Sequence, residues 1–135
     1  SEFMGLSLAI IGSRSFNNFE SAQSIFKDYF NDKVDTIISG GAKGADFIAK
    51  KLSNTFNKKY IEFPADWYNL SAAPCKIKID KNNKKYNVLA GFNRNKDIIN
   101  NCNFVLAFFD GVSPGTKNSL FLAKEKKINT MIVYF

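Results

Sequence analysis

Short apolar runs alternate along this chain with segments whose apolar residues recur every three or four positions. Such runs are typical of buried strands, and the wider spacing is typical of helices that pack one face on a core. We predict five strands, at Leu6 to Ile11, Thr36 to Ser39, Tyr60 to Phe63, Asn103 to Phe109 and Thr130 to Phe135. We predict four intervening helices, one from the caps at Asn17 and Asn18 to Phe30 and three over 44–56, 92–100 and 116–126.

The alternation of strands and helices predicts an α/β fold. Strands that are apolar on both faces are typical of a parallel sheet with helices on both sides, and right-handed crossovers then give a doubly wound, mainly parallel five-stranded sheet. A length of 135 residues predicts one domain, over 4–135. We interpret Ser1 to Phe3 as a cloning remnant before a native Met4.

The segment 71–89 interrupts this alternation. It alternates like a strand from Cys75 to Asp80, becomes turn-like and lysine-rich, and ends near Tyr86. We interpret Lys76 to Tyr86 as an inserted hairpin or loop. A solvated loop is one alternative, and a contact for a phosphate backbone or a lid over a ligand pocket is the other.

Composition limits the chemistry. The chain has no histidine, which excludes Ser-His-Asp and Cys-His catalysis, and we expect no metal site. Cys75 and Cys102 are expected to be reduced thiols. No apolar run approaches the ~20 residues of a membrane helix, and no signal peptide is visible, so we expect a cytoplasmic protein without a membrane partner. The net charge of +7 favours nucleotides or nucleic acid as partners. The frequent use of lysine that is expected from an AT-rich genome would also produce this charge.

Three loops rich in small residues follow predicted strands, at Gly12 to Arg14, Ser39 to Gly44 and Ser113 to Thr116. In a doubly wound sheet, ligands bind beyond the carboxyl ends of the strands, where these loops would meet. Glycine lets the backbone approach a ligand, and free amides at a helix start attract phosphate. Small residues also make tight turns without any ligand, but three such loops on one edge favour a phosphate-binding site. The pattern is neither the P-loop nor the dinucleotide fingerprint.

Five ordered motifs give the chain a family resemblance, and they are IGSR at 11–14, SGGAKGAD at 39–46, PADW at 64–67, RN at 94–95 and SPGT at 113–116. Together they resemble the SLOG superfamily, which groups the DprA/Smf DNA-processing proteins with the LOG phosphoribohydrolases. Within it, the chain resembles the small, single-domain YspA (cpYpsA-related) branch, which also occurs in phage genomes. The resemblance runs from Leu6 to Phe135.

The resemblance implies a Rossmann-like fold that binds a nucleotide or nucleotide-derived ligand, with no other cofactor required, and often a homo-oligomer. The ligand-binding residues that it implies are Gly12, Ser13, Arg14, Ser39, Gly40, Gly41, Ala42, Gly44, Asp46, Asp66, Trp67, Arg94, Asn95, Ser113, Gly115 and Thr116.

Individual residues leave structural alternatives open. Asp46 either stabilises the start of a helix or binds a ribose, and Asp66 is either a turn residue or a second carboxylate at a glycosidic bond. Trp67 either packs or stacks on a base. Arg14 and Arg94 are the two arginines beside 17 lysines, which favours planar recognition of phosphate over a general surface charge.

Three functions follow as hypotheses. We favour a module that senses or sequesters a nucleotide. The first alternative is a LOG-like nucleotide N-glycosidase with Asp46, Asp66 and Arg94 as candidate catalytic residues. LOG enzymes, however, carry a catalytic glutamate where this chain has Ser119, and Gly111 to Ser113 replace their Pro-Gly-Gly. The second alternative is DprA-like binding of single-stranded nucleic acid, which the net charge and the lysine-rich insert favour.

Overall fold

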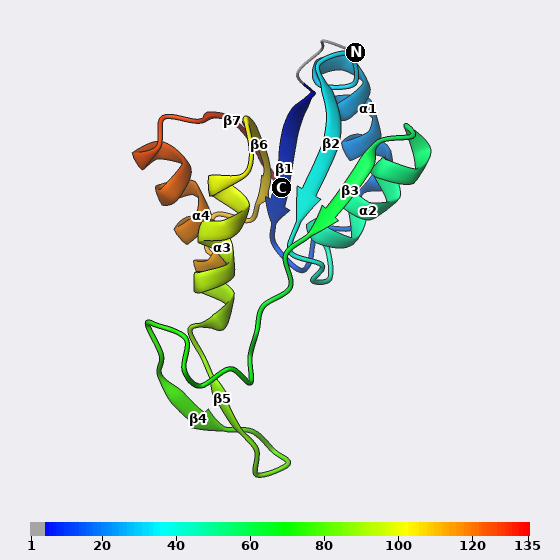
Figure 1. The fold of residues 1–135 in the computed structure, drawn as a ribbon. Coiled ribbons are helices and arrows are strands. Elements are labelled where there is room, and N and C mark those ends of the chain that lie inside the picture. The colour runs from blue at the N-terminus through cyan, green and yellow to red at the C-terminus, as the bar shows by residue number, and fades with distance from the viewer. Residues whose placement is uncertain (1–4) are drawn as a thin grey trace.

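The five predicted strands form one parallel sheet in a computed structural model, which describes residues 5–135 (Figure 1). The interpretation of Ser1 to Phe3 lies outside the described residues. The strand order is β3-β2-β1-β6-β7, and every neighbouring pair is parallel. The strands are β1 (Leu6–Gly12), β2 (Val34–Ser39), β3 (Lys59–Glu62), β6 (Phe104–Phe109) and β7 (Asn129–Tyr134). This sheet confirms the predicted doubly wound α/β fold.

The four helices cover the sheet on both faces. One pair is α1 (Phe19–Tyr29) and α2 (Ala45–Thr55), and the opposite pair is α3 (Ala90–Asn100) and α4 (Pro114–Glu125) (Figure 1). The side chain of Asn18 accepts a hydrogen bond from the Ser21 N–H at 3.0 Å, which confirms Asn18 as a cap. Helix α4 begins two residues earlier than predicted because Pro114 occupies its first turn, where a missing N–H is tolerated.

The core has two layers, one on each face of the sheet. Successive residues of β1 point to opposite faces, so Leu8 and Ile10 pack under α1 and α2, while Ala9 and Ile11 pack under α3 and α4. The prediction that strands are apolar and buried on both faces holds for the central strands. It fails at both edge strands, where Ile61 of β3 is 43% exposed and Tyr134 of β7 is 66% exposed, because an edge strand has a neighbouring strand on one side only.

The cysteines are free thiols, as predicted. Burial raises the pKa of Cys102 to about 11, so this thiol stays protonated at neutral pH. No helix within residues 5–135 has both the length and the apolarity to cross a membrane.

The strand order places a topological switch point between β1 and β6. The chain moves outward from β1 through β2 to β3, then crosses back to β6 and continues to β7. The loops after β1 and β6 therefore diverge to opposite faces of the sheet at its carboxyl edge. This divergence opens a crevice at the place where doubly wound proteins bind ligands.

The insert is a hairpin of β4 (Ile77–Ile79) and β5 (Lys85–Asn87), which are antiparallel. It projects beyond the carboxyl edge of the main sheet, below α3 (Figure 1). Asn87 is fully buried and anchors it: its N–H donates to the Trp67 carbonyl at 2.8 Å, and its Oδ1 accepts from the N–H groups of Lys76 and Leu89, both at 3.0 Å. Its Nδ2 donates to the Pro74 carbonyl at 3.2 Å. A two-stranded hairpin alone is marginally stable, so this anchor fixes the insert.

We expect Asn87→Ala to release the hairpin while the main sheet stays folded. The change leaves the part-buried N–H groups of Lys76 and Leu89 without their acceptor, at a cost of about 1 kcal/mol for each. Limited proteolysis with trypsin should then cleave the lysine-rich hairpin faster than in the wild type. Asn82→Ala, at an exposed position of the hairpin turn, is the control and should keep the wild-type cleavage rate. Equal cleavage rates for the two variants would contradict the anchoring role.

Candidate functional site

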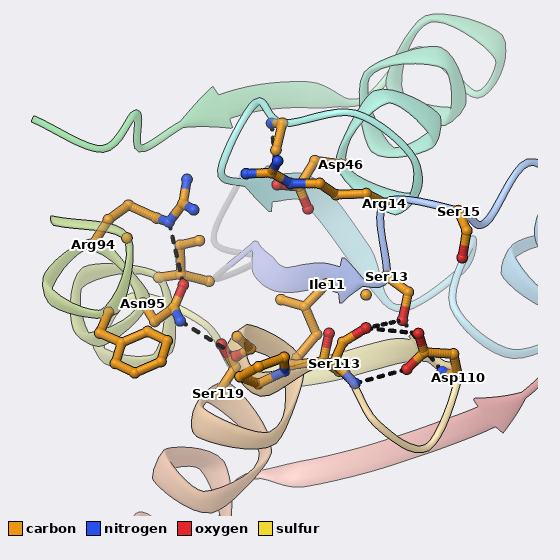
Figure 2. A pocket seen from close by; sticks show the side chains of 18 of the residues that line it. Ile11, Ser13, Arg14, Ser15, Asp46, Arg94, Asn95, Asp110, Ser113 and Ser119 are labelled. Atoms are coloured by element: carbon orange, nitrogen blue, oxygen red, sulfur yellow. Dashed lines mark hydrogen bonds between the residues drawn. The ribbon is translucent and has the colours of Figure 1, made fainter. Parts of the chain in front are cut away.

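A cavity of about 470 Å³ occupies the switch point (Figure 2). The loops after β1, β2 and β6 form its walls together with α3 and α4, as predicted for the carboxyl edge. Its lining contains eleven of the predicted ligand-binding residues, namely Gly12, Ser13, Arg14, Ala42, Asp46, Trp67, Arg94, Asn95, Ser113, Gly115 and Thr116. The other predicted residues do not line it, namely Ser39, Gly40, Gly41, Gly44 and Asp66.

Arg94 lies on the α3 side of the cavity and is held by hydrogen bonds to backbone and side chain. Its Nη1 donates to the carbonyls of Gly40 at 2.8 Å and Phe63 at 3.3 Å, and its Nε donates to Asn95 Oδ1 at 3.2 Å. Asn95 is buried and in turn donates to Asn118 Oδ1 at 3.1 Å, which ties α3 to α4. These bonds use Nε and Nη1, so the Nη2 group remains for a ligand.

Two guanidinium groups share this cavity. Burial lowers the pKa of Arg94, the nearby charge of Asp46 raises it, and the charge of Arg14 lowers it further. Arg14 is exposed and projects over the cavity from the loop after β1 (Figure 2). Because the two like charges repel each other across a partly desolvated space, a bound anion would stabilise both.

Asp46 closes the glycine-rich loop after β2. Its Oδ2 accepts a hydrogen bond from the Ala42 N–H at 3.1 Å from the first turn of α2. Burial raises the pKa of this carboxyl, while the amide of Ala42 and the charge of Arg94 lower it. Asp46 lies in the first turn of α2 and also lines the cavity, so the helix-stabilising and the ribose-binding interpretations both stay predictions.

The predicted glycine-loop residues outside the cavity shape its wall. Gly44 has a φ of +74°, and a Cβ atom there would collide with the carbonyl oxygens of Ser13 and Arg14. A Cβ atom on Gly40 would overlap the Arg94 guanidinium. Ser39 is fully buried, and its hydroxyl lies 2.6 Å from the Tyr60 hydroxyl. These residues let the loops and Arg94 pack closely and do not themselves face the cavity.

The loop after β6 is organised by Asp110. Its Oδ1 accepts from the N–H groups of Val112 at 2.9 Å and Ser113 at 2.8 Å, and its Oδ2 accepts from the Ser113 hydroxyl at 2.8 Å. The Ser13 and Ser113 hydroxyl oxygens lie 2.8 Å apart, which joins this loop to the loop after β1 (Figure 2). The amide and hydroxyl of Ser113, predicted to cradle phosphate, therefore already have a carboxylate partner.

Gly115 and Thr116, in the first turn of α4, line the cavity. Pro114 has no N–H, and the Lys117 N–H donates to the Ser113 carbonyl at 3.0 Å, which starts the helix. No acceptor within residues 5–135 pairs with the N–H groups of Gly115 and Thr116. A Cβ atom on Gly115 would meet no atom within 4 Å, so this wall is open. Two free amides at a helix start form a binding position for an anion.

We expect the Asp110 loop to be insensitive to pH in the neutral range. Hydrogen bonds from the Val112 and Ser113 amides lower the pKa of Asp110 to about 2. A lowered folded pKa adds stability that is complete above the unfolded value of about 3.9 and is lost as the pH falls toward 2. Denaturation by urea between pH 5 and pH 2 should therefore show a smaller pH dependence for Asp110→Asn than for the wild type. Identical pH dependence would contradict the assigned hydrogen bonds.

Aromatic side chains form the side of the cavity nearest the insert. Trp67 is 37% exposed and Phe92 is 41% exposed, and both line the cavity. The Trp67 ring meets Tyr86 edge-on at 6.4 Å between centroids, so it has both a packing partner and a free surface. Asp66 is exposed and lies outside the cavity, so the structure does not bring it together with Asp46 as a carboxylate pair.

Sequence reasoning missed several lining residues, chiefly Asp110, Phe92 and Val88. Asp110 precedes Val112 and Ser113 in a turn, and an aspartate in that position commonly accepts hydrogen bonds from the amides that follow, so this signal was present. Phe92 lies in the first turn of α3 and Val88 lies just before that helix, and no local pattern indicates that they line the cavity.

Comparison with known proteins gives structural likeness alone. No family model matches the chain, and no curated protein sequence matches it. The structure is similar to DNA processing protein A (DprA) from Streptococcus pneumoniae, with a TM-score of 0.71 and 19% identity over 95% of this chain and 50% of that one. It is also similar to DprA from Helicobacter pylori, described with a single-stranded DNA binding mode, with a TM-score of 0.65 and 21% identity over 95% of this chain and 65% of that one.

These likenesses confirm the DprA-like fold expected from the SLOG resemblance. The chain spans between half and two thirds of the length of the two DprA chains. The YspA branch and the phage origin stay predictions.

Proposed function

We propose that this chain, which has a DprA-like fold, binds single-stranded nucleic acid and seats one nucleotide of the strand in the switch-point cavity. The observation that carries the proposal is the pairing of two arginines with two free helix amides around one cavity. Arg14 and Arg94 supply the charge, and the N–H groups of Gly115 and Thr116 supply directed donors. Arginine suits phosphate because its planar group can donate two parallel hydrogen bonds.

The rest of the lining suits a nucleoside. A volume of about 470 Å³ is within the range of small-molecule sites and is suitable for one nucleotide. Trp67 and Phe92 offer aromatic faces on which a base could stack, which favours binding without strong base preference. Asn95 holds Arg94 in place through the bond to its Nε.

Two features favour a strand over a free nucleotide as the occupant. One solved protein with this fold is described with a single-stranded DNA binding mode. The chain also carries a net charge of +7, and five lysines lie in the insert next to the aromatic wall. The cavity alone would equally suit a free nucleotide, so a sensor or sequestering module remains the second candidate.

A hydrolytic use of the cavity would need two carboxylates with different roles. Asp46 and Asp110 both line it, and their surroundings raise the pKa of the first and lower the pKa of the second. The LOG-like alternative would therefore use Asp110 in place of Asp66. Release of free base from nucleoside monophosphates would be its signature.

The variant Gly115→Asp tests the proposal because it should weaken binding without disturbing the fold. The new side chain enters open space, and a carboxylate in the first turn of a helix is favourable for stability. It would occupy the anion position and repel phosphate, so we expect affinity for a fluorescein-labelled oligothymidylate of about 15 nucleotides to fall about tenfold or more.

The matched control is Gly115→Ala, which adds a methyl group in the same place without charge. Fluorescence anisotropy should give this variant an affinity close to that of the wild type. Competition with unlabelled thymidine monophosphate separates the two candidate functions. If the cavity binds free nucleotides, micromolar thymidine monophosphate should displace the labelled oligonucleotide. If it binds a strand, the oligonucleotide should stay bound at that concentration. Equal affinity of the wild type and Gly115→Asp would refute the cavity as the binding site.

A further inference from the structure

We infer that the inserted hairpin is a second binding surface, which contacts the sugar–phosphate backbone of a nucleic-acid strand leaving the cavity past Trp67. The basic arm is defined here as residues 71–89. The inference rests on the proposed function of the cavity and adds a contact region to it. The observations that carry it are the charge of the arm, its continuity with the cavity wall and its anchored conformation.

The basic arm concentrates the positive charge of the chain. It carries five lysines and one acidic residue, a net charge of +4 out of +7 for the whole chain. The lysines are all exposed, and they are Lys76, Lys78, Lys81, Lys84 and Lys85. The acidic residue, Asp80, is engaged within the arm, because its Oδ1 accepts from the N–H groups of Asn82 at 2.8 Å and Lys84 at 3.0 Å. An exposed positive cluster of this kind attracts a phosphate backbone.

The basic arm is continuous with the wall of the cavity. Val88, which directly follows β5, lines the cavity, and its N–H donates to the Lys76 carbonyl at 2.9 Å. Trp67 lines the cavity on the same side and contacts Tyr86 edge-on. Tyr86 lies opposite Lys78 in the hairpin register. A strand that leaves the cavity over Trp67 therefore meets an aromatic ring and then a lysine.

The conformation of the basic arm is fixed before any ligand binds. Asn87 anchors its base, and the Asp80 N–H donates to the Lys84 carbonyl at 2.9 Å to close its turn. The Lys84 ammonium lies 3.8 Å from the centroid of the Tyr68 ring, which holds both side chains beside the hairpin. A surface ordered in advance loses less entropy on binding, so its lysines act as a set.

The two faces of the hairpin differ in character. Lys78 and Tyr86 share one face, whereas Lys85 shares the other with Ile77 and Ile79, which are 53% and 58% exposed. Exposed isoleucines beside lysines would also suit an anionic membrane surface. We favour the strand because the face with Lys78 and Tyr86 is the one that joins the aromatic wall of the cavity. Binding to a membrane is therefore an outcome of the test.

The test removes charge from the basic arm without changing the cavity. The arm variant changes Lys76, Lys78, Lys81 and Lys85 to Gln, and it keeps Lys84, which packs on Tyr68. The matched control changes Lys27, Lys124, Lys126 and Lys127 to Gln, four exposed lysines at the ends of α1 and α4, which lie away from the arm (Figure 1). Fluorescence anisotropy would measure the affinity of each protein for labelled oligothymidylates of about 4 and about 15 nucleotides, over a range of salt concentrations.

We expect the arm variant to lose about tenfold or more in affinity for the longer oligonucleotide. The slope of log affinity against log salt concentration should also decrease in magnitude by about 0.7 for each phosphate contact that is removed. The shorter oligonucleotide has few nucleotides beyond the one seated in the cavity, so its affinity should fall much less than that of the longer one. The control should change both affinities by less than about twofold.

Two results would overturn the inferred binding role of the basic arm and leave the proposed function of the cavity unaffected. One is wild-type affinity of the arm variant for the longer oligonucleotide. The other is arm-dependent binding to phosphatidylserine vesicles with no arm-dependent change in oligonucleotide affinity. If the wild type bound neither oligonucleotide, both the inferred role of the basic arm and the proposed function would be overturned.

Discussion

Replacement of Arg94 by alanine is expected to weaken oligonucleotide binding about thirtyfold. The guanidinium is fixed by Gly40, Phe63 and Asn95, which leaves its Nη2 group without an acceptor among residues 5–135 and available to a ligand. A hydrogen bond to a charged group contributes about 2 kcal/mol, which corresponds to that change in dissociation constant. Titration of labelled oligothymidylate into the wild type and Arg94→Ala, followed by anisotropy, would measure it.

Two comparisons separate recognition from folding in this variant. Arg94→Lys keeps the charge but loses the planar fork, so its affinity should lie between those of the wild type and Arg94→Ala. Urea denaturation would report any loss of stability from the unpaired carbonyls of Gly40 and Phe63. Binding of the folded Arg94→Ala variant within twofold of the wild type would show that Arg94 is purely structural.

Replacement of Phe108 by alanine should lower the free energy of unfolding by about 3–5 kcal/mol, because it empties a large volume in the core. Phe108 is fully buried on β6, and its ring stacks on Phe16 at 4.1 Å between centroids. Its carbonyl also accepts from the Ser13 N–H at 3.0 Å, so the same residue supports the loop after β1. Such a loss is a large fraction of the 5–15 kcal/mol that is typical of a domain.

Phe121→Ala is the matched control for this prediction. Phe121 lies on α4 and is 60% exposed, so its truncation should change the free energy of unfolding by about 0.5 kcal/mol or less. Urea denaturation curves of the two variants would give both values. Similar losses for Phe108→Ala and Phe121→Ala would contradict the assignment of the core.

The main fold was predictable because its elements are locally encoded. The apolar runs of β1, β2 and β6 and the three-to-four spacing of the helices each depend on a few neighbouring residues, and the strand–helix alternation then selects a parallel sheet. The exact start of α4 depended on Pro114 at its first turn. The exposed side chains of β3 and β7 depend on the position of these strands at the edges of the sheet, which strand periodicity alone does not reveal.

The site was predictable only in part because many small residues near a ligand face away from it. Ser39 and Gly40 lie in the predicted motif, yet one bonds to Tyr60 and the other accepts a hydrogen bond from Arg94. Asp66 lies next to Trp67 in sequence, but only the tryptophan lines the cavity. A motif locates a loop at the sheet edge, whereas the direction of each side chain depends on backbone torsion and tertiary packing.

The most direct test of the proposed function is photo-cross-linking of an oligonucleotide that carries 5-iodouracil, followed by peptide mapping with mass spectrometry. Bases stacked in the switch-point cavity should attach to the peptides that contain Trp67 and Phe92, and Gly115→Asp should remove those cross-links. Cross-links confined to the distant surface of α4 and β7, around Phe121 and Ile132, would contradict binding in the cavity.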